Sequence, residues 1–252
     1  MDRLTYIGHA SALLRLDGVA ILTDPMLRGW LGPLKRQGPP PDHRLPEKAD
    51  LVLISHLHLD HLDLRSLRRI PESTPAVAPR GASKWVRKGG DRPIEEIGIG
   101  ETVSMLGTEI TGVRATHDGY RNLHRGRPIE ALGYLIRRGG RTVYFAGDTD
   151  LFPEMSELGQ VGVALLPVWG WGPSVGDGHL DPERAVRALE MIRPAIAVPI
   201  HWGTFYPAGL RRFRPEPLIE PPLEFKRLAN TAAPEVEVRI VQPGGTTELE
   251  PA

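Results

Sequence analysis

A short segment rich in metal-binding side chains constrains this chain more than any other feature. Four such side chains stand within six residues, in the sequence His56-Leu57-His58-Leu59-Asp60-His61. Random placement would give this pattern in fewer than about one in a thousand sequences of similar composition. The segment follows residues 51–54, an apolar run typical of a buried strand. His56 and His58 project to the same side of an extended chain, and Asp60 and His61 can face a neighbouring point after a turn, so one loop can supply two metal ions.

Three further candidate ligands lie downstream. A catalytic divalent ion needs about three or four protein ligands and an open position, so the loop requires partners elsewhere in the chain. His117, Asp148 and His201 each come at the end of a strand-like run. A single histidine at a strand end is more often hydrogen-bonded than metal-bound, and a single aspartate there is typical of a turn or cap. Their joint placement favours one shared site.

The absence of cysteine limits the chemistry of any metal site. A chain without Cys forms no disulfide, thiolate nucleophile or zinc finger, so a metal ion must be held by nitrogen and oxygen ligands. The 31 Lys and Arg residues balance the 31 Asp and Glu residues, which leaves no global field to attract a nucleic acid. No run resembles a signal peptide or a membrane span, so we expect a cytoplasmic protein without stable membrane association.

The remaining sequence predicts one layered domain of mixed strands and helices over residues 1–252. Asp17-Gly18, between two apolar runs, predicts a hairpin turn. Strand-like runs recur from residue 76 to residue 147, and we interpret them as a meander of antiparallel strands. Residues 182–192 are predicted to form a helix, with Asp181 as its N-cap and Pro182 at its first position.

The order of the motifs resembles that of the metallo-β-lactamase-fold hydrolase superfamily. In that superfamily an aspartate, an H-x-H-x-D-H segment, a histidine, a second aspartate and a last histidine follow one another. The corresponding residues here are Asp24, the segment from His56 to His61, His117, Asp148 and His201. The resemblance spans about residues 5–203. It implies an α/β (α+β) fold, the four-layer αββα sandwich, with a dinuclear metal site in the cleft between the sheet edges.

Four shorter segments resemble the branch of that superfamily that contains N-acyl phosphatidylethanolamine phospholipase D and L-ascorbate-6-phosphate lactonase. They are Tyr6-Ile7-Gly8-His9-Ala10-Ser11, Leu22-Thr23-Asp24-Pro25, His179-Leu180-Asp181-Pro182-Glu183 and His201-Trp202-Gly203-Thr204-Phe205. The resemblance implies a metal-dependent hydrolase, phosphodiesterase-like or lactonase-like. The chain is short and has no evident amphipathic extension, which disfavours long-chain lipids as substrates.

Carried over residue by residue, the resemblance implies two ligand sets and a bridging carboxylate. They are His56, His58 and His117 for one divalent ion, Asp60, His61 and His201 for the second, and Asp148 between them. Zinc is the usual metal of the superfamily, with Mn²⁺ or Fe²⁺ as alternatives. Two such ions can hold a bridging water as hydroxide, which acts as the nucleophile, so no protein nucleophile is required.

Three more residues are candidates for supporting roles. Asp24 either orients a ligand imidazole from behind or forms an Asp-Pro turn. His179, on a loop before the predicted helix, is a candidate to bind an anionic group of the substrate or to protonate the leaving group, and we assign catalytic roles to His179 and Asp60. His9 either lies near the cleft, as the branch resemblance implies, or is a packed histidine at a strand end, and we favour the second interpretation.

Other functions fit parts of the sequence. Residues 172–176 match the G-x-S-x-G pattern of a serine nucleophile, but no strand runs directly into the match and no helix directly out of it. A non-hydrolytic metal-binding or redox protein on the same fold is the main alternative. The bridging hydroxide suits small esters, phosphodiesters or lactones. Arg121, Arg125 and Arg127 either attract an anionic substrate or form a solvated loop, and a homo-oligomer is compatible with the sequence.

Overall fold

The computed structural model describes residues 1–121, 128–170 and 175–250. Two seven-stranded sheets form its centre. The first consists, in spatial order, of β17 (Thr246–Glu248), β1 (Arg3–Gly8), β2 (Ser11–Leu16), β3 (Val19–Thr23), β6 (Leu51–Leu53), β7 (Ala76–Pro79) and β8 (Ile94–Ile97). The second consists of β16 (Glu237–Val238), β14 (Ile196–Ile200), β13 (Val163–Pro167), β12 (Arg141–Phe145), β11 (Leu132–Arg138), β10 (Thr108–Arg114) and β9 (Thr102–Met105).

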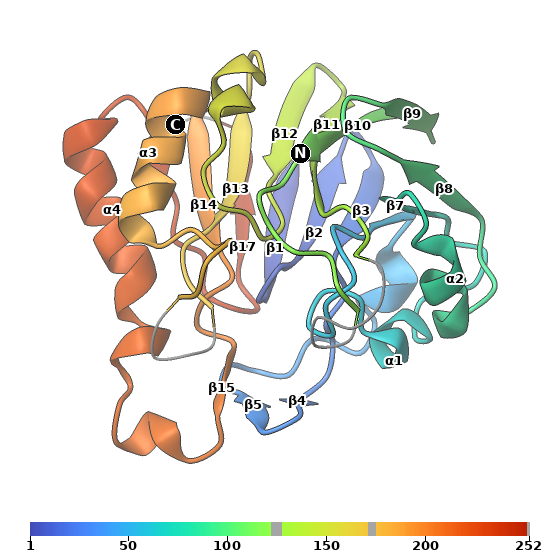
Figure 1. Cartoon of the computed structure of the whole chain (residues 1–252), viewed down its shortest axis with the longest axis horizontal. Coiled ribbons are helices and arrows are strands. Elements are labelled where there is room, and N and C mark those ends of the chain that lie inside the picture. Colours follow the sequence, from blue (N-terminus) through green and yellow to red (C-terminus); the bar gives the residue numbers. More distant parts are fainter. Residues whose placement is uncertain (122–127, 171–174, 251–252) are drawn as a thin grey trace.

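The other elements lie around these sheets. A small third sheet contains β15 (Phe205–Pro207), β5 (Leu34–Arg36) and β4 (Trp30–Leu31). The α-helices are α1 (Leu64–Leu67), α2 (Ser83–Val86), α3 (Pro182–Ile192) and α4 (Glu220–Ala232). The 3-10 helices are η1 (Pro46–Lys48), η2 (Arg87–Gly89), η3 (Pro153–Glu157), η4 (Leu210–Arg212) and η5 (Glu216–Leu218). Figure 1 shows α3 and α4 beside β13 and β14, and α1 and α2 on the opposite side near β7.

Apolar side chains explain why the two sheets stack. One continuous core joins side chains of both sheets, including Leu4 and Leu14 from the first and Ile136 and Tyr144 from the second. A separate cluster covers the outer face of the first sheet, where Leu67 and other helix residues pack on the strands. Burial of these side chains is the main favourable term in folding. The arrangement of two mixed sheets between helices confirms the predicted four-layer sandwich.

Local sequence signals agree with the structure at several points. The turn at Asp17 and Gly18 joins β2 to β3, and both residues have positive φ, as a type I′ hairpin turn requires. The helix predicted over residues 182–192 is α3, and Asp181 caps it by accepting a hydrogen bond from the N–H of Arg184. The predicted antiparallel meander is correct from β9 to β12, but β7 and β8 are parallel, because the chain between them crosses over through α2.

No helix among the residues that the structure describes is both long enough and apolar enough to cross a membrane.

Candidate metal centre

The strand ends explain why the candidate ligands converge. Strands β3 and β6 are parallel neighbours, so Asp24 and the segment that begins at His56 leave the first sheet at one edge. In the second sheet β12, β13 and β14 are parallel, and Asp148 and His201 follow the carboxyl ends of β12 and β14. All seven predicted ligands belong to groups of His and Asp whose potential ligand atoms lie within 4.8 Å of one another. The same groups include Asp24, His179 and His9.

The first ligand group consists of His56, His58 and His117. The Nε2 atoms of His56 and His117 lie 3.0 and 3.1 Å from Nδ1 of His58. In each ring the other nitrogen faces an acceptor outside the group: His56 Nδ1 with Ser55 Oγ at 2.9 Å, His58 Nε2 with Asp118 Oδ1 at 2.8 Å, and His117 Nδ1 with Gly178 O at 2.9 Å.

These outer hydrogen bonds determine where the imidazole protons are. A carboxylate or carbonyl oxygen only accepts, so His58 and His117 donate from their outer nitrogens. Ser55 Oγ donates its own proton to the Asp24 carboxylate and therefore accepts from His56. A neutral imidazole has one N–H, so the three inner nitrogens present lone pairs to one another. Lone pairs at this spacing do not hydrogen-bond among themselves, whereas a divalent cation between them can bind all three.

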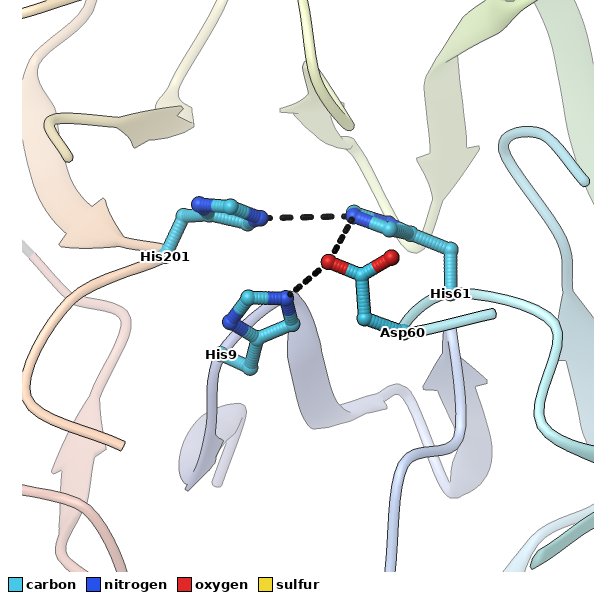
Figure 2. A group of neighbouring side chains, drawn as sticks. All are labelled: His9, Asp60, His61 and His201. Carbon is cyan, nitrogen blue, oxygen red and sulfur yellow. Dashed lines mark hydrogen bonds and ion pairs between the residues drawn. The ribbon is translucent and has the colours of Figure 1, made fainter. Parts of the chain in front are cut away.

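The second ligand group consists of Asp60, His61 and His201, which Figure 2 shows together. His61 Nε2 lies 3.3 Å from His201 Nε2 and 3.9 Å from Asp60 Oδ2. The outer nitrogens again donate, His61 Nδ1 to Asp24 Oδ2 at 2.7 Å and His201 Nδ1 to Trp169 O at 2.6 Å. With both rings neutral, their Nε2 lone pairs and the Asp60 carboxylate form a donor set suited to a second cation.

The Asp148 carboxylate lies between the two groups. Its Oδ2 is 3.0 Å from His61 Nε2, and its Oδ1 is 3.1 Å from His201 Nε2. Asp148 also belongs to a group of potential ligand atoms with His117. The side chain is buried, and the described residues provide no hydrogen-bond donor to Oδ1. Such an oxygen is costly to bury unless a cation neutralises it, so the position of Asp148 fits a bridging ligand.

Burial and charge act in opposite directions on the imidazoles. Burial lowers the pKa of His117 to about 4, and burial and the neighbouring His61 hold the pKa of His56 well below its usual value. These two rings are neutral at pH 7, as metal ligands must be. At His61 burial also lowers the pKa, but the carboxylates of Asp148 and Asp60 outweigh it and raise the pKa well above its usual value. A metal ion can supply the positive charge that these carboxylates require, in place of a proton.

Asp24 contacts a proposed ligand from behind. It is fully buried, with a φ of +33°. Its Oδ1 accepts from the N–H of Ser55 at 2.7 Å, and its Oδ2 accepts from His61 Nδ1. Of the two sequence interpretations, the contact with His61 is the geometry that orientation of a ligand imidazole requires.

His179 lies at the border of the site. Its Nδ1 donates to Asp177 O at 3.1 Å, and its Nε2 lies 3.5 Å from Asp148 Oδ2. Burial lowers the pKa of His179, but the hydrogen bond and charge of Asp148 outweigh burial and raise it to about 9. The side chain is 25% exposed, so a small molecule at the site can reach it.

His9 combines features of the two sequence interpretations, because it is packed and also lies at the site. Its ring is buried, as a packed histidine would be, but its Nε2 lies 2.9 Å from Asp60 Oδ2. The ring also lies 3.8 Å from that of His201 between centroids, and Figure 2 shows His9 turned toward the second ligand group. The available signal was its place in residues 6–11, a segment that resembles the phospholipase and lactonase branch.

Arg121 binds the backbone of the loop that carries four of the candidate ligands. Its Nη1 donates to the carbonyl oxygens of Leu57 and Leu62, at 2.8 and 2.7 Å. These bonds connect the segment after β10 to both ends of the loop from His56 to Leu62. Arg121 Nη1 therefore already has two acceptors within the protein. Arg125, Arg127 and residues 172–174 of the G-x-S-x-G match lie outside the described residues.

Known proteins resemble this chain over nearly its whole length. A family model described as a β-lactamase superfamily domain matches residues 20–202. A UPF0173 metal-dependent hydrolase of Methanopyrus kandleri is 35% identical, over 98% of this chain and 99% of its own. An N-acyl-phosphatidylethanolamine-hydrolyzing phospholipase D of Caenorhabditis elegans is 32% identical, over 84% of this chain and 67% of its own.

A solved structure shows the same likeness. The metallo hydrolase of the hyperthermophilic archaeon Ignicoccus hospitalis superimposes with a TM-score of 0.74 and 30% identity, over 98% of this chain and 97% of its own. The family model begins before Asp24 and ends after His201, so it includes every predicted ligand. The chain therefore belongs to the β-lactamase superfamily and is a metal-dependent hydrolase of the metallo-β-lactamase fold.

Proposed function

We propose that this chain uses two zinc ions to hydrolyse a small phosphodiester, with small esters and lactones as related substrates. The observation that carries the proposal is the convergence of imidazole lone pairs in two groups on either side of Asp148. The proposed ligands are His56, His58 and His117 for the first ion, Asp60, His61 and His201 for the second, and Asp148 for both.

The donor set suits zinc. Imidazole and carboxylate are common zinc ligands, and this chain has no thiolate to offer. When bound, the two ions supply a nucleophilic hydroxide from a water of lowered pKa and neutralise charge on the substrate. Mn²⁺ and Fe²⁺ accept the same ligand types, and elemental analysis distinguishes the three metals.

The carboxylates keep the ligands in place. Asp24 fixes the ring of His61 by accepting from its Nδ1. Asp148 lies beside His61 and His201 of the second group and shares a cluster of ligand atoms with His117 of the first, so it would contact both ions. Asp60 adds negative charge to the second group and would therefore lower the attraction of a bound second ion for the substrate. We propose this effect as the catalytic role of Asp60.

His179 is proposed to contact the substrate. The hydrogen bond from its Nδ1 to Asp177 O fixes the ring so that Nε2 faces the Asp148 carboxylate. From this position Nε2–H can be donated to the leaving-group oxygen as its bond to phosphorus breaks. A proton donor at this point is most useful when the leaving group is a poor one.

Two observations support a small phosphodiester as the substrate. The Caenorhabditis elegans relative is named as a phospholipase D, and phospholipases of that class hydrolyse a phosphodiester bond. The net charge of zero provides no field to attract a nucleic acid. We therefore propose a small anionic molecule as the partner of this site and no nucleic acid.

Zinc-loaded protein can be assayed with bis(4-nitrophenyl) phosphate, 4-nitrophenyl acetate and γ-butyrolactone. We expect the largest kcat/KM relative to the uncatalysed rate for the phosphodiester. Asp148→Asn serves as the inactive control, with its fold checked by circular dichroism. A larger ratio for the ester or the lactone would reassign the substrate class. Two bound zinc ions with no activity on any of the three would contradict the proposal.

His179→Ala tests the proton donor. We expect it to retain both metal ions but to lose about 100-fold in kcat on diphenyl phosphate, whose phenolate is a poor leaving group. On bis(4-nitrophenyl) phosphate the expected loss is only about threefold, because nitrophenolate leaves without a proton. Equal losses on both substrates would show that His179 does not donate a proton to the leaving group.

A further inference from the structure

His9 is fixed by its backbone against the second ligand group. It lies between β1 and β2 with a φ of +59°, a left-handed conformation that glycine or asparagine adopts at lower cost. Its N–H donates to Thr204 Oγ1 at 2.7 Å, and its carbonyl oxygen accepts from the N–H of His201 at 2.8 Å. Residues 201–204, which include the proposed ligand His201, therefore hydrogen-bond both the N–H and the carbonyl group of His9.

Close packing keeps the turn at His9 in this conformation. A Cβ atom on Gly8 would lie 2.7 Å from Thr204 Oγ1 and 2.9 Å from Arg36 Nη1. Two proposed parts of the second site, Asp24 and His201, also have positive φ. Backbone strain of this kind clusters at functional sites, where the surrounding structure maintains it.

The ring of His9 donates a hydrogen bond to a member of the second ligand group. Its Nε2 lies 2.9 Å from Asp60 Oδ2, and a carboxylate only accepts, so Nε2 carries a proton. Each of the five imidazoles of the two ligand groups instead has its outer nitrogen beside an oxygen acceptor, so that its inner nitrogen can offer a lone pair when a metal ion replaces any proton there. A protonated nitrogen does not bind a metal ion, so His9 differs from the proposed ligands.

We infer that His9 is a positioning residue, whose Nε2–H holds the Asp60 carboxylate in the orientation that binds the second ion. This inference rests on the proposed dinuclear function. The hydrogen bond restricts rotation of the carboxylate and leaves its remaining lone pairs for the ion. Loss of a hydrogen bond to a metal ligand typically weakens metal binding by about 10- to 100-fold.

The packing of His9 can be separated from its hydrogen bond. Its ring contacts that of His201 and lies edge-on to Phe205, with centroids 5.6 Å apart. His9→Phe keeps an aromatic ring in this space and removes the donor, whereas His9→Gln keeps an N–H at similar reach. Thr74→Val is the matched control, because it removes a buried hydrogen bond, from Thr74 Oγ1 to Ala49 O at 3.2 Å, between two residues that are not proposed ligands.

The test is a zinc titration against a chromophoric chelator. We expect wild-type protein and Thr74→Val to bind two ions with the same affinities. His9→Phe should bind the first ion as the wild type does and the second at least about tenfold more weakly, with His9→Gln in between. An unchanged affinity of His9→Phe for the second ion would overturn this inference and leave the dinuclear proposal standing. A wild-type protein that binds one ion would overturn the dinuclear proposal as well.

Cobalt loading provides a readout that does not depend on His9→Phe. If His9 only positions Asp60, the visible absorption of Co²⁺ at the second site keeps the same band positions in His9→Gln. If His9 were itself a ligand, replacing an imidazole by an amide would shift those bands, and that result would contradict the inference.

Discussion

The two ligand groups are built alike but differ in burial at one pair of residues. Each has two residues from segment 56–61 and one histidine that follows a strand of the second sheet. The His58 side chain and its partner Asp118 are 28% and 39% exposed, whereas His61 and its partner Asp24 are fully buried. Water can replace a lost partner of His58, whereas a lost partner of His61 leaves a buried group unpaired. The same kind of substitution should therefore have unequal effects in the two groups.

The largest effect is expected when a ligand is removed from the first group. His58→Ala removes the nitrogen that the two other rings face, so the first ion should be lost and kcat should fall by about a thousandfold or more. Because the His58 side chain is partly exposed, the free energy of unfolding of metal-free protein should change by less than about 1 kcal/mol. Elemental analysis, kinetics and urea unfolding in chelator measure these quantities.

The control for His58→Ala is Leu59→Ala, at an exposed position on the same loop. It should leave metal content, kcat and stability unchanged. Full metal content in His58→Ala would break the comparison, since it would show that the first group does not bind an ion.

A smaller effect is expected from Asp24→Asn, which changes the carboxylate behind His61 of the second group. The amide would direct an NH₂ group at a donor, either the Ser55 N–H or His61 Nδ1–H. We expect the free energy of unfolding to fall by about 2 kcal/mol and the second ion to bind about 10- to 100-fold more weakly. Urea unfolding and zinc titration measure both. A wild-type free energy of unfolding together with a wild-type affinity for the second ion would mean that Asp24 forms a turn and does not orient His61.

The smallest effect is expected from the matched substitution behind the first group, Asp118→Asn, which changes the carboxylate that contacts His58. The amide oxygen can still accept from His58 Nε2, and water reaches the site. The affinity for the first ion should fall by less than about tenfold, and the free energy of unfolding should stay within about 0.5 kcal/mol of wild type. Losses as large as those of Asp24→Asn would remove the contrast between the two groups.

The parts of the fold that follow from neighbouring residues could be predicted from the sequence. Asp17 and Gly18 set a hairpin because adjacent residues with positive φ match the twist of two strands. Asp181 and Pro182 set the start of α3 because capping acts within one turn. The candidate ligands could be found because a buried strand appears in the sequence as an apolar run. The ligands stand in segments that follow such runs.

The parts that depend on distant contacts could not be predicted in the same way. His9 meets Asp60 across 51 positions of sequence, and no periodicity records that contact. The parallel pairing of β7 and β8 depends on a crossover through a four-residue helix that is too short to show a helical pattern. Arg121 reaches the carbonyl groups of Leu57 and Leu62 through tertiary folding, which charge alone does not indicate.

The central claim is that the two ligand groups hold two metal ions. Elemental analysis of untagged protein, purified without chelator and then reconstituted with zinc, tests that claim without requiring a substrate. We predict about two ions per chain for the wild type and about one for His58→Ala. One ion or none in the reconstituted wild-type protein would contradict a dinuclear centre.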